Sequence, residues 1–225
     1  MARQGSATLS ITNRLGNRVI LMFPDTSIFH ESMKVALEPA VPAARTFVSS
    51  YARVQKSRRT WSKEMGEGES AVSRMVASNR GWLPVLASAV PGFAAADYFD
   101  GTDLPDEHIL NCQNLCNFVR DYHDGQGNAL PFEDRLLNDL LPLTETASRE
   151  WTEAVSANAE YQRLVTEMHT HADIFDIELQ RLRKVILAHY GSGSSYYQRL
   201  RASRVREEPT NGEAQQQQAD GAAAK

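Results

Sequence analysis

The sequence is poor in cysteine, glycine and proline, and each shortage narrows the possible structures. Two cysteines, Cys112 and Cys116, are too few for the disulfide framework that holds a small secreted fold together. Only 13 glycines and 9 prolines interrupt the 225 residues, and long stretches contain neither. Because glycine and proline are the residues that break helices, their scarcity favours helical structure.

Long apolar runs are also missing. The N-terminal residues show no basic segment followed by an apolar one, and their longest apolar run is Val19–Phe23. A membrane span needs about 20 apolar residues. We therefore predict a cytoplasmic protein without a transmembrane segment; export by a route without an N-terminal signal is the alternative.

The chain has no excess of positive charge. Its formal net charge is −4, and much of this comes from the acidic residues that follow residue 206. A nucleic-acid-binding protein usually shows a strong basic excess or a basic stripe, so we predict that nucleic acid is an unlikely partner. A hydrophobic content of 42% and a charged content of 23% are ordinary for a folded protein.

The N-terminal part predicts two short helices. Residues 1–7 are expected to be a flexible terminus, and the apolar spacing over 8–23 predicts a helix. Gly16 weakens this prediction, and a hairpin that turns at 15–17 is the alternative. A second short helix is expected at 28–38. The two prolines that should end or kink it are Pro39 and Pro42.

A long helix is predicted over residues 42–90. Apolar side chains recur there every three or four residues, and the phase survives Gly66 and Gly68. Glycines in a turn between two helices would not preserve the phase, so we expect one helix, straight or bent at the glycines. After a connector, the first-turn residues Pro105, Asp106 and Glu107 predict a third short helix at 105–123.

The second long helix is predicted over residues 131–190. Its seam alternates in steps of three and four residues across roughly seven heptads, which is typical of a coiled coil or a long bundle. The seam residues are Leu137, Leu140, Thr144, Ala147, Trp151, Ala154, Asn158, Tyr161, Val165, Met168, Ala172, Phe175, Leu179, Leu182 and Ile186. Pro142 is expected to kink the first turns, and a short turn is expected at 196–206.

These elements predict an all-α fold. We expect an elongated antiparallel helical bundle or coiled-coil hairpin of the two long helices, 42–90 and 131–190, with short accessory helices. Residues 8–206 would form a single helical-bundle domain, and 207–225 a disordered Gln/Ala-rich tail.

Charge placement suggests a register for the hairpin. If Leu86 lies opposite about Leu140, the basic residues of the first long helix face acidic residues of the second. The basic residues are Arg53, Lys56, Arg58 and Arg59, and the acidic residues are Asp173, Asp176 and Glu178.

Few residue groups could carry chemistry. Cys112 and Cys116 lie one turn apart beside apolar residues, so core packing is a better interpretation than half of a metal or redox site. The weak metal candidates are His169, Asp173 and Asp176. No Glu-x-x-His sequence accompanies them, so a solvated polar flank is the better interpretation, and we predict no metal and no cofactor.

Two features suggest interactions. Arg199, Arg201 and Arg204 form a short basic run beside tyrosines, which could contact phosphates or could be a solvated helix end. Asn158 stands at a seam position, where asparagine often specifies register or partner.

The preferred hypothesis is a non-enzymatic helical scaffold or protein-interaction protein. It would act by coiled-coil or helix docking, with a protein partner or as a homodimer, because the seam is long and no catalytic constellation is found. One alternative is a membrane-active, pore-forming helical protein, and another is a nucleic-acid-associated factor that uses the basic clusters. No small-molecule substrate is identified, and an enzyme is the least favoured class.

Overall fold

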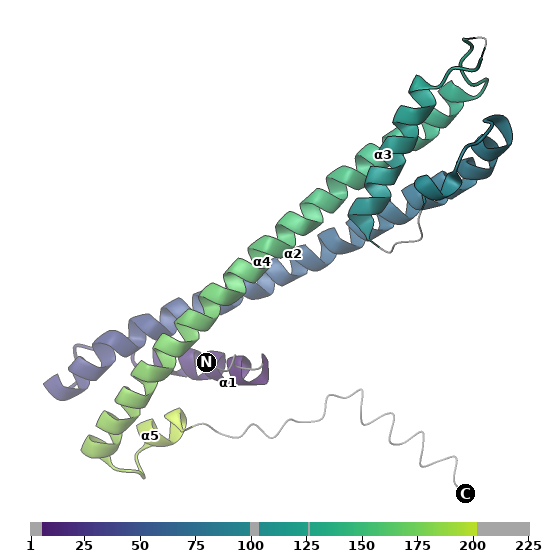
Figure 1. The fold of residues 1–225 in the computed structure, drawn as a ribbon. Helices are drawn as coiled ribbons and strands as arrows, with labels where there is room; N and C mark the ends of the chain where they lie inside the picture. The colour runs from purple at the N-terminus through teal and green to yellow at the C-terminus, as the bar shows by residue number, and fades with distance from the viewer. Residues whose placement is uncertain (1–5, 100–103, 126, 202–225) are drawn as a thin grey trace, which may run out of the picture. The chain divides into compact units, whose positions relative to one another are not determined.

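The computed structural model describes residues 6–99, 104–125 and 127–201, and its regular structure there is entirely helical. Two long helices dominate it (Figure 1). The elements are α1 (Ser6–Met22), α2 (Glu31–Ala89), the 3₁₀ turn η1 (Ala95–Asp97), α3 (Pro105–Asp121), α4 (Glu133–Tyr190) and α5 (Ser195–Leu200). The all-α prediction is confirmed, as is the antiparallel pair of long helices with short accessory helices. Residues 1–5 and 202–225, and with them the expected tail, lie outside the described residues.

The chain divides into two compact units. The terminal unit comprises Met1–Tyr51 and Glu167–Lys225, and the central unit comprises Ala52–Thr166. Both long helices contribute to both units, and within each unit they run antiparallel. The expectation of a single domain over 8–206 stays a prediction beside this division.

Helix α2 begins earlier than the sequence pattern indicated. The short helix expected at 28–38 and the long helix expected at 42–90 are one continuous helix that passes through Pro39 and Pro42. A proline leaves the carbonyl four residues before it without a helical donor. Those carbonyls belong here to Val35 and Glu38, which are both exposed residues, so the lost bonds fall on the solvent side of the helix while the opposite face stays buried.

Gly16 lies inside α1 and does not form a turn, so the helix prediction for 8–23 is confirmed over its alternative. A Cβ atom added at Gly16 would lie 2.9 Å from Val48 Cγ2 of α2. The glycine therefore allows the two helices of the terminal unit to approach closely.

Gly68 has the same role in the central unit. A Cβ atom there would lie 3.3 Å from the Ala154 Cβ atom and from the Glu150 carbonyl oxygen of α4. Gly66, by contrast, faces open space. The prediction that α2 passes through these glycines without a break is confirmed.

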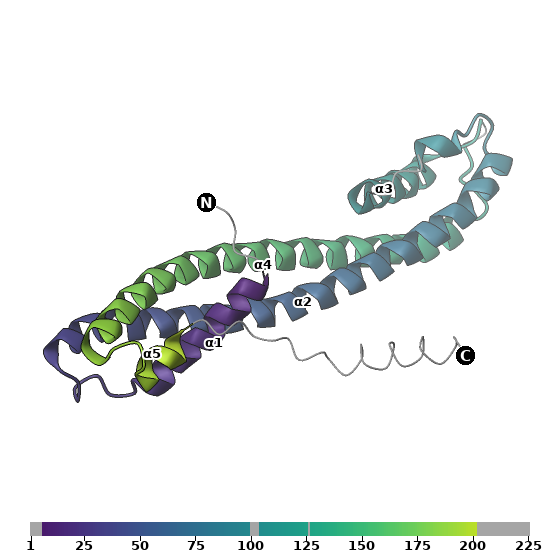
Figure 2. The same ribbon diagram turned by 90° about the horizontal axis from the view of Figure 1, so that it is seen from below.

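The terminal unit has an aromatic and aliphatic core. Phe47 of α2 stacks on Phe175 of α4 with ring centroids 5.9 Å apart, and both rings are fully buried. Helices α1 and α5 lie side by side against this part of the long helices (Figure 2). Leu200 of α5 is fully buried there, which fixes the last described helix to the unit.

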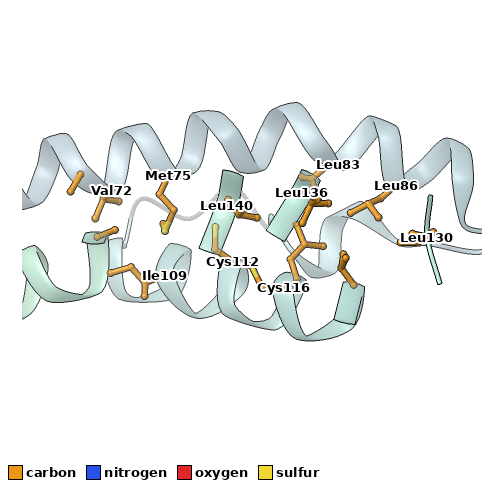
Figure 3. Packing of buried hydrophobic residues seen from close by; sticks show 14 of the residues in the cluster. Val72, Met75, Leu83, Leu86, Ile109, Cys112, Cys116, Leu130, Leu136 and Leu140 are labelled. Atoms are coloured by element: carbon orange, nitrogen blue, oxygen red, sulfur yellow. The ribbon is translucent and has the colours of Figure 1, made fainter. Parts of the chain in front are cut away.

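Part of the central unit is a three-helix bundle. Ile109, Cys112 and Cys116 of α3 point toward the side of α2 that carries Met75 and Leu83 (Figure 3). Both thiols are free and buried, which confirms that they are core cysteines. Burial raises the pKa of the Cys112 thiol to about 12, so it is protonated at neutral pH.

The seam of α4 is confirmed over most of its length. Leu140, Thr144, Ala147 and Ala154 are buried in the central unit, and the seam positions from Met168 to Ile186 are buried in the terminal unit. Thr144 donates to the Leu140 carbonyl oxygen at 2.8 Å, which satisfies its buried hydroxyl.

The register suggested by charge is wrong by one helical turn. It would have placed Phe47 opposite Leu179 and Trp61 opposite Val165. The rings stack instead on Phe175 and Tyr161, about four residues earlier along α4.

Polar contacts of the central unit agree with the observed register. Asp139 of α4 accepts hydrogen bonds from Trp82 Nε1 at 2.8 Å and from Ser78 Oγ at 2.7 Å, both on α2. These bonds, that from Trp82 first, hold the pKa of the Asp139 carboxyl below its ordinary value.

Among the described residues, none of the helices combines the length and the apolar character that a membrane span requires.

Candidate docking groove

The central unit contains a stretch in which α2 and α4 leave their facing side chains half exposed. Val54 is the one buried side chain of α2 between residues 52 and 67, and Leu164 is the one buried side chain of α4 between residues 155 and 166. The part of the unit that α3 covers buries a continuous cluster that includes Met75, Leu86 and Leu140. The long helices thus bury fewer side chains in the stretch that α3 does not cover, and we call this stretch the thin core.

An aromatic pair occupies the middle of this stretch. Trp61 and Tyr161 stack with ring centroids 5.0 Å apart and an interplanar angle of 9°. Both residues are half buried, and the Trp61 Nε1 atom is buried without a hydrogen-bond partner. The pair joins the two helices, but it leaves apolar surface in contact with water.

A groove of about 310 Å³ lies between the helices in this stretch. Its apolar lining residues are the half-buried Ala157 and the buried Leu164 of α4, and Arg53 and Lys56 stand on the α2 wall. The lining residues are Arg53, Lys56, Ser57, Thr60, Ala157, Glu160 and Leu164. An apolar floor between polar walls is suited to the apolar stripe of an amphipathic helix.

The acidic residues of α4 beside the groove are paired within their own helix. Glu160 accepts hydrogen bonds from Nε and Nη2 of Arg163, each at 2.7 Å. These bonds, together with the charges of Arg163 and Arg53, lower the pKa of Glu160. Glu150 accepts a hydrogen bond from Arg149 at 2.8 Å.

The basic residues of α2 are less fully paired. Lys63 binds Glu67 at 2.9 Å and Glu64 at 3.5 Å, and these carboxylates raise its pKa. Lys56, Arg58 and Arg59 form no ion pair with any described residue. The α2 side of the stretch therefore carries uncompensated positive charge.

Sequence reasoning missed an acidic cluster at the end of this stretch. Oxygen atoms of Glu64, Glu67 and Glu150 all lie within 4.8 Å of one another. Lys63 and Arg149 are bound to these carboxylates, so the group forms a surface ion-pair network. The pairing of Gly68 with Glu150 across the helices brings the carboxylates together, and no local sequence pattern reveals that pairing.

The weak metal candidates lie in the terminal unit. His169 and Asp176 are half buried, and Asp173 is exposed. Asp176 accepts a hydrogen bond from Gln180 Nε2 at 2.9 Å. Within the described ranges, these residues do not belong to any group of three close metal-ligating side chains. The predicted absence of a metal stays a prediction.

The structure describes only part of the basic run that follows α4. Arg199 lies on α5 and Arg201 directly after it, both exposed, while Arg204 lies outside the described residues. Two other arginines hold α5: Arg18 Nη1 donates to the Arg199 carbonyl oxygen at 3.1 Å, and Arg183 Nε donates to the Leu200 carbonyl oxygen at 2.8 Å. They satisfy carbonyl groups that a helix end leaves without partners.

Asn158 lies at the helix interface beside the groove residue Ala157. It is half buried and forms no hydrogen bond with the residues that the structure describes. Its role in register or partner choice stays a prediction.

The comparisons identify no relative from which a function could be carried over: the chain matches no family model, no curated protein and no solved structure.

Proposed function

We propose that this protein is a non-enzymatic helical scaffold that docks a helix of a protein partner in the groove between α2 and α4 of the central unit. The observation that carries the proposal is the thin core around Trp61 and Tyr161, next to a three-helix segment of the same unit. A third helix laid on the groove would bury the half-exposed Ala157 and would lie over Leu164, which α2 and α4 already bury, as α3 covers other parts of the two helices.

The volume of the groove and its position between two helices support a helix as the ligand. A groove of about 310 Å³ between two parallel walls accepts a row of side chains spaced three and four residues apart. Such a contact is small, so the proposal is for reversible docking.

The proposal is tested by site-specific photo-crosslinking in cells. In one variant a photoreactive amino acid replaces Thr60 in the groove. In a control variant of the same protein it replaces Ser88, an exposed position of α2 outside the groove. We expect Thr60 to capture a protein of defined mass that Ser88 does not capture. A captured mass equal to that of the chain itself would identify the homodimer as the form of docking.

Equal patterns at the two positions would contradict the proposal. Capture of nucleic acid at Thr60 in place of protein would favour the nucleic-acid-associated alternative. Leakage of liposomes on addition of the protein would favour the membrane-active alternative.

A further inference from the structure

We infer that the helix docked in this groove is acidic on the flank that faces α2. The inference rests on the proposed docking function and adds the chemical class of the partner. It follows from the charges of the groove walls, from their pairing within each helix and from the apolar floor.

The α2 wall is basic over a long stretch. No aspartate or glutamate occurs in the chain between Glu38 and Glu64. Within the central unit this stretch carries a dense set of cations. They are Arg53, Lys56, Arg58, Arg59 and Lys63. Arg53 and Lys56 line the groove itself, and Lys63 is paired with Glu64 and Glu67. A partner helix beside this wall is stabilised by carboxylates and destabilised by further cations.

The α4 wall neutralises this charge only in part, because Glu160 interacts with Arg53 and no carboxylate of α4 pairs with Lys56. Glu160, its carboxylate in the groove, is held by two hydrogen bonds from Arg163 of the same helix. Lys56, which lines the opposite wall, has no ion pair within the described ranges. The charge that remains for a partner is therefore positive and is concentrated on one side of the groove.

The same walls disfavour a nucleic acid. A phosphate backbone carries negative charge along its whole length and would meet the Glu160 carboxylate as well as Lys56. Ala157 and Leu164 offer it no hydrogen bonds. An amphipathic helix can complement the floor and both walls of the groove. Its apolar stripe would lie on the floor, its carboxylates would face α2, and a neutral or basic flank would face Glu160.

The test uses two synthetic helical peptides of about 20 residues, a length at which a helix can form in isolation. Both carry the same leucine and alanine stripe. One has glutamate on its polar face, and the other has lysine at the same positions. Fluorescence anisotropy measures the binding of each peptide to the full-length protein at low and at physiological salt.

We expect the acidic peptide to bind more tightly than the basic one, and added salt to weaken it. Lys56→Glu should lower its affinity about fivefold or more, because a favourable charge becomes a repulsive one. Arg74→Glu makes the same charge change at an exposed position of α2 outside the groove and should have little effect. Ala157→Trp, which fills the floor, should weaken the binding of the acidic peptide without a change of charge.

Circular dichroism of each variant establishes that it is folded. Equal affinity for the two peptides, or equal effects of Lys56→Glu and Arg74→Glu, would overturn the inference. So would tighter binding of a DNA duplex of similar length than of the acidic peptide. If Thr60 captures a protein while the acidic peptide is not preferred, docking stands and the acidic partner is rejected; if Thr60 captures nothing, the docking proposal itself fails.

Discussion

Gly16 is a residue at which α1 lies in close contact with α2. The space left by its missing side chain is already filled by Val48, so a larger residue must push the helices apart. Gly66 also lies in a helix, but it faces open space, and it therefore provides a control at which only the helix propensity changes.

Gly16→Val should destabilise the protein by about 1–3 kcal/mol, the usual effect of overpacking a well-filled contact. Gly66→Val should change the free energy of unfolding by less than about 0.5 kcal/mol. Thermal unfolding followed by circular dichroism measures both. An equal effect of the two substitutions would show that close packing at Gly16 does not stabilise the terminal unit.

The buried thiols give the central unit a dependence on pH. Burial raises the pKa of Cys112 from its ordinary value of 9.0 to about 12, and that of Cys116 is raised by the same cause. Because the folded protein holds the proton more tightly than the unfolded chain, this stabilisation is present below about pH 9 and is lost as the pH rises toward 12.

We expect both cysteines to react slowly with iodoacetamide at pH 8 in the native protein, because the thiolate is the reactive form and both side chains are buried. In denaturant both should react at the rate of a free cysteine. Mass spectrometry of timed samples counts the modified thiols. Fast modification of the native protein would show that α3 opens readily.

At the scale of the element, α2 retains two prolines, of which Pro39 is half buried and Pro42 is exposed. Each proline removes one helical hydrogen bond, while it also restricts the unfolded chain. The sequence pattern could not show that burial of residues such as Leu37 and Ala40 outweighs this loss. That is why we expected the helix to be broken near Pro39.

Pro42→Ala should stabilise the protein by about 1–3 kcal/mol, because it restores the hydrogen bond to the Glu38 carbonyl oxygen at an exposed position. Pro131, exposed in the turn before α4, is the matched control, and Pro131→Ala should be neutral or slightly destabilising. Denaturant unfolding curves compare the two. A loss of stability in Pro42→Ala would mean that the proline itself supports the start of α2.

The register of α2 and α4 is set by specific side chains and not by the seam alone. A seam that repeats every three or four residues offers nearly equal apolar contacts after a shift of one turn. Trp61 on Tyr161, and Asp139 on Trp82, distinguish the observed register from its neighbour.

A double-mutant cycle of Trp61→Ala and Tyr161→Ala should give a coupling energy of about 0.5–1.5 kcal/mol, as expected for stacked rings. The same cycle with Val165→Ala, the partner in the rejected register, should give a smaller coupling. Chemical unfolding of the single and double variants provides the values. The reverse order of couplings would support the register suggested by charge.

At the scale of the whole molecule, the sequence predicted correctly which residues are buried on a single helix face. The seam residues of α4 and the core position of Cys112 follow from periodicity alone. It failed where two distant segments must be aligned. The register error of one turn assigned Lys56 and its neighbours to acidic partners, and this concealed both their uncompensated charge and the groove that they flank.

Local stability should differ along the central unit. The bundle that α3 covers buries Met75 and Leu140 completely, whereas the groove stretch buries little besides Val54 and Leu164. We expect amide hydrogen exchange to be slow over residues 71–86 and 136–147 and faster over 55–66 and 155–163. Peptide-level exchange measured by mass spectrometry tests this, and uniform protection along both helices would show that the groove stretch is as rigid as the bundle.

The uncompensated cations of α2 also have a kinetic consequence. Exposed charge acts in solution over a Debye length, about 8 Å at physiological ionic strength, before any surfaces touch. Lys56, Arg58 and Arg59 would then draw an anionic partner toward α2 and accelerate its arrival, while Ala157 and Leu164 would govern how long it stays. Attraction and retention would thus be assigned to different helices of the same hairpin.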